Sequence, residues 1–136
     1  MYYPSETLKA KLCIDGAKQL KNYVKNKKLW IDECGKILVP TNDISYKNLD
    51  LLINRAKENK VEAYLISNAE AIKLEPNLSK DFENAILIPF TSIVNPKEVM
   101  NSLLKDFINL RGKINYNEEV INIDSKVNKI KTKKNH

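Results

Sequence analysis

Glycine is scarce in this chain of 136 residues, with only three glycines, at positions 16, 35 and 112. Loops that bind nucleotide phosphates, such as G-x-G-x-x-G and G-x-x-x-x-G-K-[ST], need closely spaced glycines because the backbone must approach the phosphates. Three glycines so far apart form neither motif. The sequence therefore excludes a glycine-rich nucleotide-binding loop from this polypeptide.

Histidine and cysteine are also scarce: the chain has His136 at its last position and two cysteines, Cys13 and Cys34. This set excludes the paired C-x-x-C motifs of zinc sites and a Cys–His catalytic pair. A Ser–His–Asp triad lacks its histidine, because a terminal residue such as His136 is expected to fray. We interpret the two cysteines as reduced, partly buried thiols.

Long apolar runs are absent too. The longest, such as residues 85–88, cover only a few positions, whereas a helix that crosses a bilayer needs about 20 apolar residues. Residues 1–4 lead directly into a charged stretch, without the basic and apolar regions of a signal peptide. With 43% hydrophobic and 29% charged residues, the chain is typical of soluble globular proteins, and we expect a cytoplasmic location.

The net charge of +6 comes from the C-terminal end. Residues 125–136 contain five lysines and no acidic residue, which leaves 18 basic and 17 acidic residues in the rest of the chain. No basic stripe interleaved with aromatic residues precedes this tail, so we expect no specific nucleic-acid binding. Abundant lysine, asparagine and isoleucine are typical of a gene from an A+T-rich genome.

The pattern of apolar residues predicts alternating helices and strands in one α+β unit, without internal repeats. Ser5 is a candidate N-cap for the first helix, Ser67 and Glu70 form a candidate capping box, and Asn95-Pro96 is a strong helix start. We predict helices over residues 6–28, 49–56, 68–74 and 96–111, strands over 36–39, 61–66, 85–88 and 113–116, and a hairpin formed by 119–123 and 129–132.

Several short motifs, in order along the chain, resemble one known family. They are YYP and TLKAKLC at residues 2–4 and 7–13, CGKILV at 34–39, RAKEN at 55–59, AEAIKLEPN at 69–77, IPFTSIVNP at 88–96 and NEEVINI at 117–123. Together they are similar to the FAD-dependent L-2-hydroxyglutarate oxidase and dehydrogenase family. This resemblance covers nearly the whole chain.

The resemblance implies an internal fragment of a two-domain FAD-dependent oxidoreductase, without the N-terminal glycine-rich Rossmann unit. Residues 1–124 would be a central region with parts of the cofactor and substrate domains, and residues 125–136 a second meander strand with a basic tail. The family oxidises a 2-hydroxyacid by hydride transfer to FAD. By the resemblance, the backbone of Val120 would face the adenine of FAD, although a plain core valine is an equal interpretation. Ser92 stands where the resembled family has a glycine, and Asn95 stands where it has an aspartate.

We therefore expect a truncated or split-gene fragment of this enzyme type that binds no FAD and has no activity by itself. Complementary fragments of the same enzyme would be its partners, and unpaired strand edges predict self-association. One alternative is reassembly of a flavoenzyme from separate chains. The other is a small binding module whose basic tail recruits an anionic partner such as RNA. Glycerol 3-phosphate is the second candidate substrate.

Overall fold

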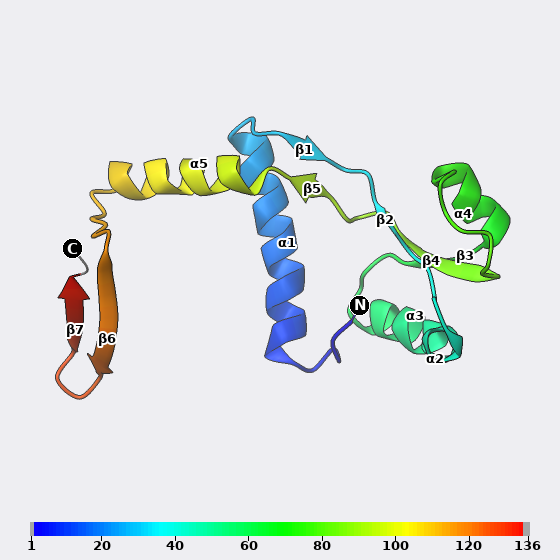
Figure 1. Ribbon diagram of the computed structural model, residues 1–136, viewed down its shortest axis with the longest axis horizontal. Helices are drawn as coiled ribbons and strands as arrows, with labels where there is room; N and C mark the ends of the chain where they lie inside the picture. Colours follow the sequence, from blue (N-terminus) through cyan, green and yellow to red (C-terminus); the bar gives the residue numbers. More distant parts are fainter. Residues whose placement is uncertain (1, 135–136) are drawn as a thin grey trace. The chain divides into compact units, whose positions relative to one another are not determined.

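The computed structural model describes the backbone of residues 2–134. The chain divides into two compact units, Met1–Val99 and Met100–His136, and we describe each by itself. The elements labelled in Figure 1 are α1 (Leu8–Asn26), β1 (Ile31–Asp32), β2 (Lys36–Leu38), α2 (Asp43–Lys47), α3 (Leu49–Glu58), β3 (Tyr64–Ser67), α4 (Asn68–Leu74), β4 (Asn84–Ile88), β5 (Ile93–Val94), α5 (Pro96–Asn109), β6 (Glu118–Asp124) and β7 (Lys129–Lys134).

The helix starts follow from local side-chain caps. Ser67 accepts a hydrogen bond from the Glu70 N–H, and the Glu70 carboxylate accepts one from the Ser67 N–H at 2.8 Å, so the predicted capping box of α4 is confirmed. Asn95 Oδ1 accepts from the Glu98 N–H at 3.3 Å and starts α5 as predicted. The prediction of Ser5 as the cap of α1 was wrong. Thr7 fills this role, because its extended backbone directs Oγ1 toward the Ala10 N–H.

The first unit contains a three-stranded antiparallel sheet in the order β2-β4-β3. Successive residues of a strand point to opposite faces, and the central strand β4 supplies apolar side chains to both. Ala85 packs with Ala71 of α4 on one face, whereas Ile86 and Ile88 pack with Leu49 of α3 on the other. Figure 1 shows α4 and α3 on either side of these strands. The central strand β4 is therefore buried between the two helices.

The N-terminal segment is held against α3 and β2 by hydrogen bonds from side chains. Asn59, a buried polar residue, donates from Nδ2 to the Tyr3 carbonyl at 3.0 Å, and Arg55 donates to the Tyr2 carbonyl at 3.2 Å. Lys36 of β2 donates to the Tyr2 hydroxyl at 2.8 Å. The side chains of Arg55 in α3, of Asn59 directly after α3 and of Lys36 in β2 therefore fix residues 2 and 3.

The second unit includes most of α5 and an antiparallel hairpin of β6 and β7. Helix α5 ends in a Schellman-type turn, in which the Gly112 N–H donates to the Phe107 carbonyl and the Arg111 N–H to the Ile108 carbonyl, each at 2.8 Å. A Cβ at Gly112 would collide with the Phe107 ring, which explains the glycine. In the hairpin, Ile123 and Ile130 remain 68% and 64% exposed, because two strands alone bury little apolar surface.

Most predicted elements are confirmed, with shifted ends. The strand expected over residues 113–116 was wrong: this segment is irregular, because none of the described residues pairs with its backbone. The predicted helix over 49–56 is α3, and it is preceded by the short, unpredicted α2. The two-residue strands β1 and β5, which pair with each other, were also not predicted. The mixed helix and strand class is confirmed.

Across the described residues, no helix is both long enough and apolar enough to cross a membrane.

Candidate functional site

A cavity of about 480 Å³ lies within the first unit, on the side of α1 that carries Ile14 and Ala17. Apolar side chains form most of its wall. They come from α1, β1, β4, β5 and the segments that precede β3 and follow β4: Ile14, Ala17, Leu20, Ile31, Val61, Ile88, Phe90 and Val94. The polar lining residues are Lys18, Lys21, Lys60, Glu62, Thr91 and Ser92. Such a cavity suits a mainly apolar occupant.

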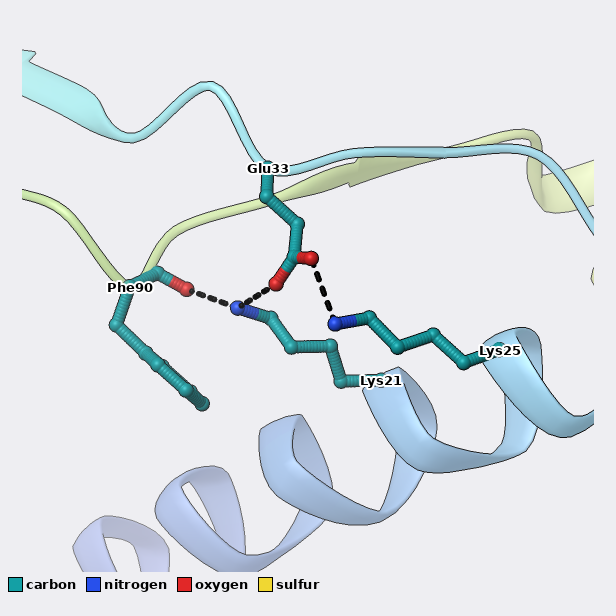
Figure 2. Close-up of polar contacts among 4 residues, drawn as sticks. All are labelled: Lys21, Lys25, Glu33 and Phe90. Atoms are coloured by element: carbon teal, nitrogen blue, oxygen red, sulfur yellow. Dashed lines mark hydrogen bonds and ion pairs between the residues drawn. The ribbon is translucent and has the colours of Figure 1, made fainter.

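Lys21, one of the residues that line this cavity, belongs to a lysine clamp, which we define as Lys21, Lys25 and Glu33 (Figure 2). The Glu33 carboxylate bridges Lys21 Nζ at 3.1 Å and Lys25 Nζ at 2.6 Å. Lys21 Nζ also donates to the Phe90 carbonyl at 3.0 Å and lies 3.7 Å from the centre of the Phe90 ring. The clamp therefore ties the segment after β1 and the segment after β4 to α1.

The two ammonium groups lower the pKa of Glu33 below its usual range, with the hydrogen bond from Lys25 as the largest cause and that from Lys21 next. Glu33 is therefore ionised at neutral pH, and Lys21 is fully engaged by Glu33 and Phe90. No sequence motif identified this cluster. Lys21 and Lys25 are one helical turn apart, but Glu33 belongs to a different segment, and only the fold brings it to them.

Gly35 fixes the course of the chain next to the clamp. Its φ of +74° lies in the left-handed region, and its N–H donates to the Thr91 carbonyl at 3.0 Å. A Cβ at this position would lie 3.5 Å from the Ile88 oxygen, which is an ordinary contact. The glycine is therefore required by its backbone conformation rather than by lack of space.

Ser92 has a buried hydroxyl that has no hydrogen-bond partner among the described residues. The non-glycine residues with positive φ in the described chain do not include Ser92, so serine adds no left-handed strain here. Its cost is instead the desolvation of an unpaired hydroxyl, about 1–3 kcal/mol. Asn95, the other departure from the resembled family, still caps α5 as an aspartate would.

The described residues do not fit the pyrophosphate of FAD. Gly16 lies within α1, Gly35 precedes a strand and Gly112 follows α5, so none of the three forms a strand-to-helix phosphate turn. Side-chain oxygens of Thr7, Asn42, Ser67 and Asn95 cap the N-termini of α1, α2, α4 and α5, whereas α3 follows α2 directly and has no side-chain cap. We therefore derive no chemical step through FAD from these residues.

The remaining candidates from the sequence are not members of the clamp. Val120 lies in β6 of the second unit, 53% exposed, with Thr132 as its register partner and a bulge directly after it. Cys13 and Cys34 are both exposed, so the prediction of partly buried thiols was wrong. Among residues 2–134, no group of three Cys, His, Asp or Glu side chains could hold a metal ion. His136 lies outside the described residues.

Comparisons with known proteins give a consistent result. A family profile described as FAD dependent oxidoreductase matches residues 1–136. L-2-hydroxyglutarate dehydrogenase from Bos taurus, a mitochondrial protein, is 33% identical over 124 residues, which cover 91% of this chain and 27% of the relative. The Escherichia coli L-2-hydroxyglutarate dehydrogenase is 30% identical over 128 residues, which cover 94% of this chain and 30% of that relative. The chain thus spans less than a third of these relatives.

Solved structures share the fold. FAD-bound L-alpha-glycerophosphate oxidase from Mycoplasma pneumoniae, reduced with dithionite, superposes with a TM-score of 0.76 at 23% identity, over 89% of this chain and 33% of that one. Glycine oxidase from Bacillus cereus gives a TM-score of 0.69 at 16% identity, over 91% of this chain and 35% of the oxidase chain. At these identities the likeness concerns the fold alone.

Proposed function

Since this chain belongs to the FAD-dependent oxidoreductase family, we propose that it is one part of an enzyme that oxidises L-2-hydroxyglutarate or a similar 2-hydroxyacid by hydride transfer to FAD. The observation that carries this proposal is the identity of 30–34% to L-2-hydroxyglutarate dehydrogenases over at least 91% of the chain. FAD supplies the hydride acceptor in such an enzyme. In this proposal, this chain contributes part of the protein framework of the enzyme.

The chain acts, in this proposal, as a truncated or split-gene fragment that binds no FAD by itself. The lack of a phosphate turn among the described residues supports this, because the three glycines are used inside or next to other elements. Residues 1–124 are the region that resembles parts of the cofactor and substrate domains, and residues 125–136 add a meander strand and the basic tail. A cytoplasmic location is part of the same proposal.

A second candidate function is reassembly of the flavoenzyme from separate chains. The exposed apolar residues of the hairpin favour it, since Val120, Ile123 and Ile130 are each more than half exposed on two strands with unpaired outer edges. In an assembled enzyme, Val120 would present its backbone to the adenine of FAD. A partner that supplies a neighbouring strand and a glycine-rich strand–turn–helix unit would complete this arrangement.

The test is to co-express this chain with reading frames that flank its gene and encode a glycine-rich strand–turn–helix unit. We expect a complex that retains FAD and reduces an artificial electron acceptor with L-2-hydroxyglutarate. Glycerol 3-phosphate serves as the competing substrate in the same assay. Faster turnover of glycerol 3-phosphate would overturn the assignment of a 2-hydroxyacid. The absence of a complex with any flanking product would overturn reassembly.

A further inference from the structure

The cavity of the first unit carries an excess positive charge that its own chain does not balance. Lys18, Lys60 and Glu62 are among the residues that line it. Within the described residues, none of these three side chains forms an ion pair or a hydrogen bond, whereas Lys21 is held by Glu33. Two unpaired ammonium groups against one unpaired carboxylate leave one positive charge in excess.

The rest of the cavity wall is mostly apolar. Ile14 and Ala17 of α1 line it, together with Ile31 and Val94, which are register partners in β1 and β5. Its volume of about 480 Å³ is within the usual size of small-molecule pockets, roughly 300–1,000 Å³. An occupant that keeps water from this wall must be apolar over most of its surface, and one that balances the charge must be an anion.

The backbone at Lys60 does not explain why a lysine stands at this edge of the cavity. Lys60 follows α3 with a φ of +54°, and its N–H donates to the Lys57 carbonyl at 3.0 Å while the Val61 N–H donates to the Ala56 carbonyl at 2.9 Å. In such a Schellman turn the left-handed position is usually glycine, because any Cβ is unfavourable there. The lysine therefore costs stability, and what it adds is a side chain at the cavity.

We propose that this cavity binds a small organic monoanion with an apolar body, of which a medium-chain carboxylate is the simplest example. The carboxylate group lies at Lys18 and Lys60, where ammonium groups donate charge-assisted hydrogen bonds to it. The hydrocarbon chain lies against the apolar wall. The Ser92 hydroxyl is shielded from water, so we assign it no contact with the ligand.

This ligand class follows from charge and apolar surface together. A phosphate ion would balance the charge but would leave the apolar wall in contact with water. A neutral or cationic molecule of the same shape would leave Lys18 and Lys60 unpaired. The site uses residues of the first unit alone, so it depends on neither FAD nor the proposed oxidation of a 2-hydroxyacid.

The first test is isothermal titration calorimetry of the whole chain with octanoate, 1-octanol and octylammonium. We expect one octanoate to bind per chain with a dissociation constant of about 1 mM or below. Binding of 1-octanol and octylammonium should be weaker by about fivefold or more, and added salt should weaken octanoate binding. The lack of saturable octanoate binding would overturn the proposal, and so would equally tight binding of 1-octanol.

A matched pair of glycine variants tests the role of Lys60. Lys28 ends α1 in the same conformation, with a φ of 53°, but does not line the cavity. Lys60→Gly and Lys28→Gly each remove one positive charge and place glycine where it is favoured, so both variants should fold. Lys60→Gly should raise the dissociation constant of octanoate by about threefold or more, whereas Lys28→Gly should leave it unchanged. Equal effects of the two substitutions would overturn the assignment of the carboxylate to this cavity.

A third variant tests the apolar part of the site. Ala17→Phe should fill the cavity from α1 and abolish octanoate binding, whereas Ala69→Phe, at an exposed position of α4 that does not line the cavity, should not. Urea midpoints of both variants check that they remain folded. Undiminished octanoate binding by folded Ala17→Phe would refute the proposed site. The two glycine variants test it independently if phenylalanine is not accommodated.

Discussion

Replacement of Ser92 by alanine should stabilise the chain, although serine-to-alanine changes at polar contacts usually destabilise. The Ser92 hydroxyl is buried and makes no hydrogen bond to the described residues, so alanine removes a polar atom without breaking a contact within the protein. An unsatisfied buried hydroxyl costs about 1–3 kcal/mol, and we expect the free energy of unfolding to rise by about 1 kcal/mol or more. In urea denaturation at fixed protein concentration, the midpoint should rise with an unchanged slope.

Two further variants make this prediction specific. Ser92→Gly should be less stable than Ser92→Ala by about 0.5–1 kcal/mol, because Ser92 is not at positive φ and glycine only adds freedom to the unfolded chain. Ser79→Ala is the control, since the exposed Ser79 hydroxyl donates to Asp81 at 3.0 Å and should not gain stability on removal. A lower midpoint for Ser92→Ala would refute the reasoning, because it would mean that the hydroxyl makes a stabilising contact.

Three other changes have expected outcomes. Gly35→Ala should lower the free energy of unfolding by about 1–2 kcal/mol, since φ is +74°, and an unchanged urea midpoint would contradict this. Ser67→Ala should cost about 1 kcal/mol in the same assay through loss of the α4 cap, and a neutral result would mean that the capping box contributes nothing. The ion pairs with Lys25 and Lys21 lower the folded-state pKa of Glu33. They therefore stabilise the folded chain at pH values above the usual glutamate pKa, and this stabilisation is lost as the pH falls through the lowered pKa. In an NMR titration, Lys25→Met should raise the Glu33 pKa more than Lys21→Met, and the opposite order would contradict the assignment.

The sequence predicted best the elements whose structure depends only on residues close to them in the chain. The Ser67–Glu70 capping box and the Asn95-Pro96 helix start need only neighbours in the chain, and both formed as predicted. β4 was also predicted, because its run of apolar residues is long enough to indicate a buried strand.

The parts that sequence did not predict depend on contacts between distant segments. Residues 113–116 alternate in polarity as a strand does, but a strand also needs a hydrogen-bonding partner. The pairing of β1 with β5 covers two residues each, too few for any periodicity to indicate. The lysine clamp joins α1 to Glu33 and Phe90, and the cavity beside it exists only once these segments meet. The cofactor role of Val120 stays a prediction.

One measurement tests most directly whether this member of an FAD-dependent family holds FAD by itself. The purified wild-type chain should be incubated with excess FAD, dialysed, and scanned for flavin absorption in the visible range. We predict no retained flavin, because the described residues offer no phosphate turn to its pyrophosphate. Retention of one flavin per chain would contradict this prediction.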